Sequence, residues 1–202
     1  DSIAKNAGTD LSSTFTTDID GQTRGVEGSW DIGADEAAVK IYRSVGNDSS
    51  DLSSSATVTI SGTTATFSTG QPDNVGVGDV IQFGGAGYYD LAFINSRISS
   101  TTYGVQGNWE IGKLEINATT SAPMNIFRAH RELDDWEDQV VGDVNPGIDS
   151  SVRGKVLVGM DLVASNTIMM VPCYASSAGD DSETGVGGWT TSGNNYINIY
   201  TI

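Results

Sequence analysis

Hydrophobic and polar residues alternate over short stretches along most of the 202-residue chain, which is the pattern of strands with one buried face. Residues 56–60 and 65–67 alternate in this way on either side of Ser61 and Gly62, which favours a β-hairpin. Short strands separated by glycine and polar turns predict a mainly β fold, either an antiparallel sandwich or a small barrel. The further predicted strands lie at 79–83, 91–94, 103–106, 155–158, 167–171 and 196–200.

Residues 125–141 interrupt this β pattern. The apolar residues of the segment recur at helical spacings of three, four and seven positions: Ile126, Leu133, Trp136 and Val140. Residues at these spacings share one face of an α-helix. The sequence therefore predicts one amphipathic helix near 125–141.

The last predicted strand carries apolar residues on both faces: Tyr196, Ile197, Ile199 and Tyr200. A strand that is apolar on both faces is typical of one that is largely buried in a sheet. The strand runs almost to Ile202, and its partner is not evident from the sequence. We therefore expect these four residues to form an interaction surface for another chain, since unpaired strand edges recruit further strands.

A glycine-rich stretch at residues 75–80 (VGVGDV) invites comparison with phosphate-binding loops. It lacks the Lys-Ser/Thr pair of such loops, and no helical pattern follows it. We interpret it as a turn that leads into the strand at 79–83.

The charge balance limits the partners that the chain can bind. There are 26 acidic and 10 basic residues, which gives a net charge of −16. Nucleic acids and anionic membrane surfaces are bound by clustered Lys and Arg, so both are poor partners for this chain. No apolar stretch approaches the length of a membrane span, which argues against membrane insertion.

The single cysteine and the single histidine do not indicate catalysis. Cys173 lies within an apolar stretch at 168–174 and is interpreted as a small buried side chain. His130 lies within the predicted helix, between Arg128 and Arg131, without a Ser or Cys motif nearby. A structural or solvent-facing role is therefore favoured for His130.

Two phrases near the start of the chain are distinctive: DIDGQTR at residues 18–24 and DIGADE at residues 31–36. Together they resemble the closing segment of secreted right-handed β-helix proteins. Later phrases, among them VGVGDVI at 75–81 and YINIYT at 196–201, resemble a module of large bacterial surface proteins that lies beside β-helix domains. The resemblance implies a β-helix-terminus-like segment at 1–36, a β-rich module at 37–202, and an extracellular or cell-surface location.

Asp18 and Asp20 form the best candidate metal site in the sequence. The Asp-x-Asp-Gly pattern brings two carboxylates to one side of a tight loop, and carboxylate oxygens suit calcium. The full twelve-residue calcium loop with its terminal Glu is absent. Calcium is the one cofactor that the sequence suggests.

These observations lead to a functional expectation. We expect a non-catalytic extracellular structural or interaction module, which assembles with copies of itself into a filament or surface layer by strand addition at its termini. The alternative is a surface protein that binds carbohydrate or degrades polysaccharide as a lyase or glycosidase, with glycans as partners. With 26 acidic residues in the chain, two suitably placed carboxylates are not evidence of hydrolysis.

Overall fold

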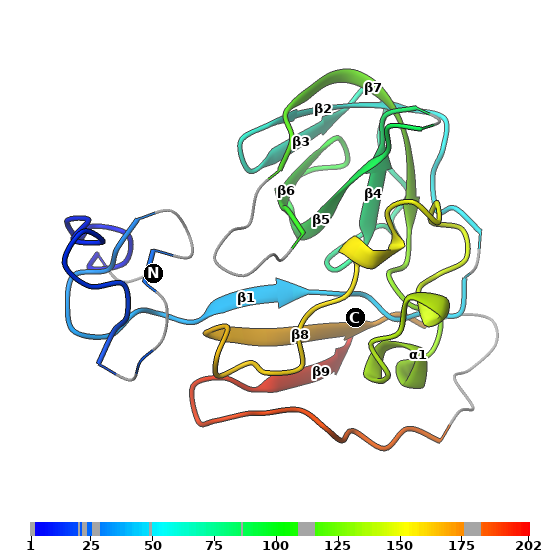
Figure 1. Ribbon diagram of the computed structural model, residues 1–202. Coiled ribbons are helices and arrows are strands. Elements are labelled where there is room, and N and C mark those ends of the chain that lie inside the picture. The colour runs from blue at the N-terminus through cyan, green and yellow to red at the C-terminus, as the bar shows by residue number, and fades with distance from the viewer. Residues whose placement is uncertain are drawn as a thin grey trace.

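A computed structural model describes residues 3–19, 21, 24–25, 29–48, 50–85, 87–108, 116–175 and 183–202. The chain forms an antiparallel barrel, a parallel three-stranded sheet beside it, and an irregular N-terminal segment that lies near the start of the sheet (Figure 1). The mainly β fold is confirmed, and the small barrel is the architecture that the chain adopts.

The barrel closes in the order β2-β3-β6-β5-β4-β7, with every neighbouring pair antiparallel. Its first hairpin turns at Gly62, whose φ of +55° is a conformation that glycine adopts without strain. Alternate side chains fill the interior, as strand geometry requires. The six strands are β2 (Thr57–Ser61), β3 (Thr64–Phe67), β4 (Val80–Phe83), β5 (Asp90–Arg97), β6 (Thr102–Gln106) and β7 (Thr119–Phe127).

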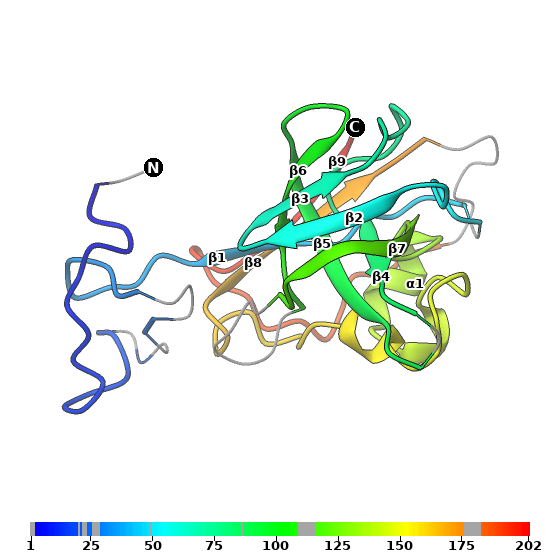
Figure 2. The same cartoon turned by 90° about the horizontal axis from the view of Figure 1, so that it is seen from above.

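The second sheet was not predicted from the sequence. It consists of β1 (Val39–Tyr42), β8 (Thr167–Cys173) and β9 (Ile197–Thr201), in the order β1-β8-β9, and both pairs are parallel. Parallel neighbours need a long crossover connection, and here the whole barrel lies between β1 and β8 in the chain. Figure 2 shows the helix α1 (Leu133–Glu137) on one side of this sheet.

The predicted helix is present but much shorter than 125–141. Residues 125–127 belong to β7, where Ile126 faces the barrel interior and Phe127 faces outward into a second buried cluster. The helix begins after Glu132 and ends before Gln139, whose φ of +50° is incompatible with a continuing helix. The predicted helix was too long because Ile126 and Phe127, two apolar residues of β7, happen to fit the helical spacing.

The strand predicted at 155–158 is also wrong. The segment begins in a short 3-10 helix, η2 (Arg153–Lys155), and continues as irregular chain; a second one, η1 (Val141–Asp143), follows α1. Val156 and Val158 are buried in two different clusters, one against the barrel and one against the parallel sheet. Burial on both sides produced the strand-like pattern without any strand pairing.

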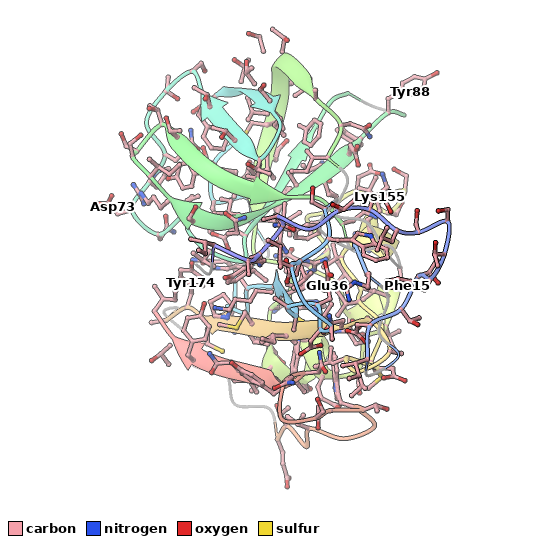
Figure 3. All side chains as sticks on the ribbon, turned by 90° about the vertical axis from the view of Figure 1, so that its left-hand side faces the viewer. Phe15, Glu36, Asp73, Tyr88, Lys155 and Tyr174 are labelled. Carbon is pink, nitrogen blue, oxygen red and sulfur yellow. The ribbon has the colours of Figure 1, made fainter. Side chains whose placement is uncertain are left out.

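A buried ion pair joins the barrel to the parallel sheet. Arg128 Nη1 donates to both carboxylate oxygens of Asp79 at 2.6 Å, and neither side chain is exposed to solvent. The guanidinium lies 3.6 Å from the ring centroid of Tyr174. Tyr174, labelled in Figure 3, directly follows β8. Burial raises the pKa of Asp79 to about 6, and the charge of Arg128 opposes this effect. Asp79 is therefore ionised at neutral pH.

The glycine-rich stretch at 75–80 makes this close packing possible. A Cβ atom on Gly78 would lie 2.6 Å from the backbone nitrogen of Ser44, and one on Gly76 would lie 2.5 Å from the hydroxyl of Tyr174. Gly76 N–H donates to Asp79 at 2.9 Å. The stretch is a turn leading into β4, as predicted, and its glycines are needed where the barrel contacts the sheet.

Two further ionisable groups lie buried close to this junction. Arg43 follows β1, donates to Val156 O at 2.5 Å and lies 3.5 Å from the ring centroid of Phe93 on β5. His130 is fully buried, so the solvent-facing alternative is excluded. Burial, with a smaller contribution from the charge of Arg43, lowers the pKa of His130 to about 3.

Replacing Arg128 tests the buried pair. Arg128→Met keeps apolar contact with Tyr174 but leaves the Asp79 carboxylate without its counter-charge. We expect the free energy of unfolding to fall by about 3–5 kcal/mol, as for other broken buried pairs. Urea denaturation followed by tryptophan fluorescence measures the loss.

The matched control for Arg128→Met is Lys155→Met. Lys155 pairs with Asp90 at 2.7 Å in a partly exposed position, where an ion pair contributes about 1 kcal/mol or less. Equal losses in the two variants would contradict the structural role of the buried pair.

His130 sets an acid limit on stability. Its folded pKa of about 3 lies below its ordinary value of 6.5, so its contribution to stability is complete above pH 6.5 and is lost as the pH falls towards 3. Asp79 acts in the opposite sense between about pH 6 and 4, because its folded pKa is raised. The shift of His130 is larger, so we expect the free energy of unfolding to fall between pH 6.5 and 4.

Denaturation at several pH values checks the two opposing effects. We expect His130→Gln to flatten the loss of stability in acid, and Asp79→Asn to steepen it. Identical pH profiles for His130→Gln and the original protein would show that His130 does not cause the acid sensitivity.

Candidate functional site

The outer edge of β9 is the first element of the candidate site. In the register of β8 and β9, Met169 N–H donates to Tyr196 O and Ile202 N–H donates to Cys173 O. Successive residues direct their backbone groups to opposite edges of a strand, so the N–H and C=O groups of Ile197, Ile199 and Thr201 point away from β8. Within the described part of the chain, no strand pairs with this side of β9.

The four predicted interaction residues all lie at this strand. Tyr196 is 43% exposed and Ile199 is 39% exposed, while Ile197 and Tyr200 are half-buried. The strand is therefore an exposed edge, and the prediction that it is largely buried is wrong. Its apolar residues on both faces reflect partial contact on each side of the sheet.

One face of the parallel sheet is open, and it is the second element of the site. The other face packs its odd-numbered residues, such as Ile41 and Val171, around the buried Trp136 of α1. Even-numbered side chains point to the opposite face, because side chains alternate along a strand. Most of these are half-buried or exposed: Lys40, Tyr42, Ile168, Met170, Asn198 and Tyr200.

Two tyrosines of the open face lie within electrostatic range of each other. Burial raises the pKa of Tyr200, and the nearby Tyr42 hydroxyl raises it further. Burial also raises the pKa of Tyr42. These phenols are therefore protonated at neutral pH, and Tyr42 pairs with Met170 across the strands.

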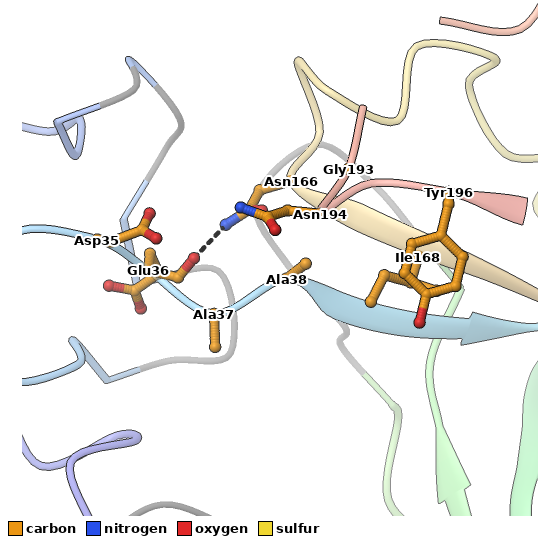
Figure 4. A pocket seen from close by; sticks show the side chains of 9 residues that line it. All are labelled: Asp35, Glu36, Ala37, Ala38, Asn166, Ile168, Gly193, Asn194 and Tyr196. Carbon is orange, nitrogen blue, oxygen red and sulfur yellow. Dashed lines mark hydrogen bonds between the residues drawn. The ribbon is translucent and has the colours of Figure 1, made fainter. Parts of the chain in front are cut away.

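A hollow of about 340 Å³ lies at the amino end of the same face (Figure 4). Asn166 is fixed beside it, because its Nδ2 donates to Glu36 O at 2.9 Å and its Oδ1 accepts from Asn195 Nδ2 at 3.1 Å. The lining combines amide, carboxyl, aromatic and aliphatic groups: Asp35, Glu36, Ala37, Ala38, Asn166, Ile168, Gly193, Asn194 and Tyr196.

The two distinctive N-terminal phrases hold each other through Arg24. This buried side chain donates to Asp31 O at 3.0 Å and Gly33 O at 2.8 Å, and its Nε lies 3.5 Å from Glu36. The guanidinium also lies 4.7 Å from the ring centroid of Trp30. Phe15 and Glu36 mark this segment in Figure 3. Arg24 therefore fixes the wall that carries Asp35 and Glu36.

Asp18 contributes to the same N-terminal structure. Its carboxylate accepts the Glu36 N–H at 3.4 Å, and the side chain is buried. Asp20 lies outside the described residues. Among the described residues, no group of three or more His, Cys, Asp or Glu side chains could hold a metal ion. The calcium site at Asp18 and Asp20 remains a prediction.

The other candidate side chains lie elsewhere. His130 is buried at the junction of barrel and sheet, and Cys173 is half-buried at the end of β8, where its Sγ contacts Val171 O at 3.7 Å. Tyr42, Met170 and Asn166 were not identified as site residues from the sequence. The alternation of side chains in the segments VKIY and TIMMV indicates which residues share a face of each strand. That these residues form one surface follows only when the pairing of β1 with β8 is known.

No family model, curated protein or solved structure matches the chain. Among the helices of the described residues, none has the length and apolar character needed to cross a membrane.

Removing Arg24 tests whether the N-terminal phrases shape the hollow. Arg24→Ala leaves Glu36 buried without its partner, so we expect residues 3–37 to open while the barrel stays folded. Hydrogen exchange should rise at least about tenfold in this segment, which corresponds to roughly 1.4 kcal/mol of local stability. Lys40→Ala, at an exposed position on β1, is the control and should leave exchange unchanged. Uniform acceleration over the barrel would contradict a local role.

Proposed function

We propose that the chain is a non-catalytic, extracellular structural module that joins other copies of itself by strand addition at β9. The observation that carries the proposal is the outer edge of β9, where the backbone groups of three residues point away from β8. Edge strands in monomeric proteins are commonly blunted by Lys, Pro or a bulge. Residues 194–202 contain neither Lys nor Pro.

The charge distribution supports β9 as the contact. A net charge of −16 makes two copies repel each other over most of their surfaces. Residues 194–202 carry no charged side chain, so a contact made here brings few like charges together. Calcium that bridges acidic groups of neighbouring copies would lower the remaining repulsion.

The partner of β9 decides the form of the assembly. Antiparallel pairing of β9 with β9 of a second copy gives a closed two-fold dimer. Pairing with a different segment of the next copy leaves an edge open at each end and gives a filament or layer. We propose the filament or layer, in which β9 pairs with a different segment of the next copy. The extracellular setting rests on the resemblance of the N-terminal phrases to β-helix ends.

The variant Ile199→Pro tests the outer edge of β9 without removing the hydrogen bonds between β9 and β8. The Ile199 N–H points away from β8, so Ile199→Pro removes an outward donor and retains the bonds to β8. We expect the variant to stay folded and to lose concentration-dependent association in analytical ultracentrifugation and negative-stain imaging. Asn198→Pro is the matched control, because the Asn198 N–H points towards β8 and its loss disrupts the folded sheet.

Repeating the measurement with calcium and with a chelator tests the bridging role of the ion. We expect calcium to increase polymer length and the chelator to decrease it. A monodisperse monomer of the original protein under both conditions overturns the proposed assembly. Polymers unaffected by Ile199→Pro would place the contact elsewhere.

A further inference from the structure

We propose that the open face of the parallel sheet, together with the hollow at its amino end, binds a neutral oligosaccharide. This proposal concerns side chains on one face of the sheet, whereas strand addition concerns the backbone edge of β9. The two proposals can therefore fail separately.

Three tyrosines lie on this face, with Tyr42 on one side of the central strand β8 and with Tyr196 and Tyr200 on the other. The register pairs Tyr42 with Met170 and Tyr200 with Pro172, and it places Tyr196 beside Ile168. Each tyrosine is thus two residues further along the sheet than the one before, in the order Tyr196, Tyr42, Tyr200. At about 3.3 Å per residue, the series spans roughly 13 Å, which is longer than a single sugar ring.

The hollow lies at the end of the open face that carries Tyr196. Tyr196 and Ile168 line it on the side of the sheet, and Asn194 lies opposite Asp35 across its mouth (Figure 4). Its volume of about 340 Å³ is at the lower end of the range for small-ligand sites, so one terminal sugar unit is a suitable occupant.

The chemistry of the face suits a sugar. The apolar C–H face of a sugar ring packs on aromatic rings, while its hydroxyls need both donors and acceptors. The tyrosine hydroxyls and the exposed amides of Asn194 and Asn198 supply both. These amides, together with exposed Lys40, interrupt the apolar surface, and such a surface fits a hydroxyl-rich ligand better than the apolar core of a protein interface.

The charge of the chain selects neutral sugars. Asp35 lines the hollow at an exposed position, and the whole chain carries a net charge of −16. An anionic polysaccharide would be repelled from a site with this surrounding. Lys40 is exposed on the open face, and Lys5 lies within electrostatic range of Tyr42. The net charge of −16 already includes both lysines.

The test uses purified protein and a panel of neutral hexasaccharides of glucose, xylose and mannose, with oligogalacturonate as the anionic comparison. Binding is measured by isothermal titration calorimetry, and tyrosine ring resonances are followed by NMR. We expect at least one neutral hexasaccharide to bind and oligogalacturonate not to bind. Tyr42→Ala and Tyr200→Ala should each weaken binding about tenfold, since each removes one stacking surface.

Tyr88→Ala is the matched control. Tyr88 is exposed on a barrel loop away from the sheet (Figure 3), so its removal should leave binding unchanged. Tyr200→Phe keeps the ring and should retain most of the affinity, and thermal melts confirm that each variant is folded. The Ile199→Pro variant should bind sugar normally even if it no longer assembles.

Two outcomes overturn the proposal. One is the absence of binding to every neutral sugar in the panel, and the other is binding that Tyr42→Ala and Tyr200→Ala leave unchanged. If these two variants instead abolish self-association without any sugar binding, the face is a contact between copies of the chain.

Discussion

The barrel meets the end of the parallel sheet at the buried pair of Asp79 and Arg128. Asp79 precedes β4 and Arg128 follows β7, so both belong to the barrel, but the guanidinium stacks on Tyr174 at the end of β8. A buried pair of this kind adds little net stability compared with apolar packing, but it tolerates few geometries. We infer that the pair fixes how the barrel lies against the end of β8.

The barrel could be predicted from the sequence to a large extent, whereas the parallel sheet could not. Barrel strands such as β2 and β3 are adjacent in the chain, and their hairpin has a turn signal at Gly62. The pairing of β1 with β8 has no such local signal, because alternation records which side chains are buried but not which strand lies alongside. The predicted helix was too long for the same reason, because Ile126 fits both the helical and the strand periodicity.

The candidate site was predictable only in part for the same reason. Tyr196 and Ile199 were identified because the last strand is apolar on both faces, and the structure places both at an exposed edge. Tyr42 and Met170 escaped notice because their shared face exists only once β1 and β8 are paired. The phrases around Arg24 were singled out as distinctive, and in the structure they hold each other and one wall of the hollow.

The proposed edge and the proposed face are geometrically compatible. Strand addition at β9 extends the sheet in its own plane, so it leaves side chains on the open face uncovered and places a new strand beside Tyr200. Copies joined in this way would present several faces along one assembly. Weak binding of a sugar at each face would then be strengthened by multivalency, because a long polysaccharide can engage neighbouring copies at high effective concentration. The proposed structural role and the proposed glycan-binding role would therefore reinforce each other in this fold.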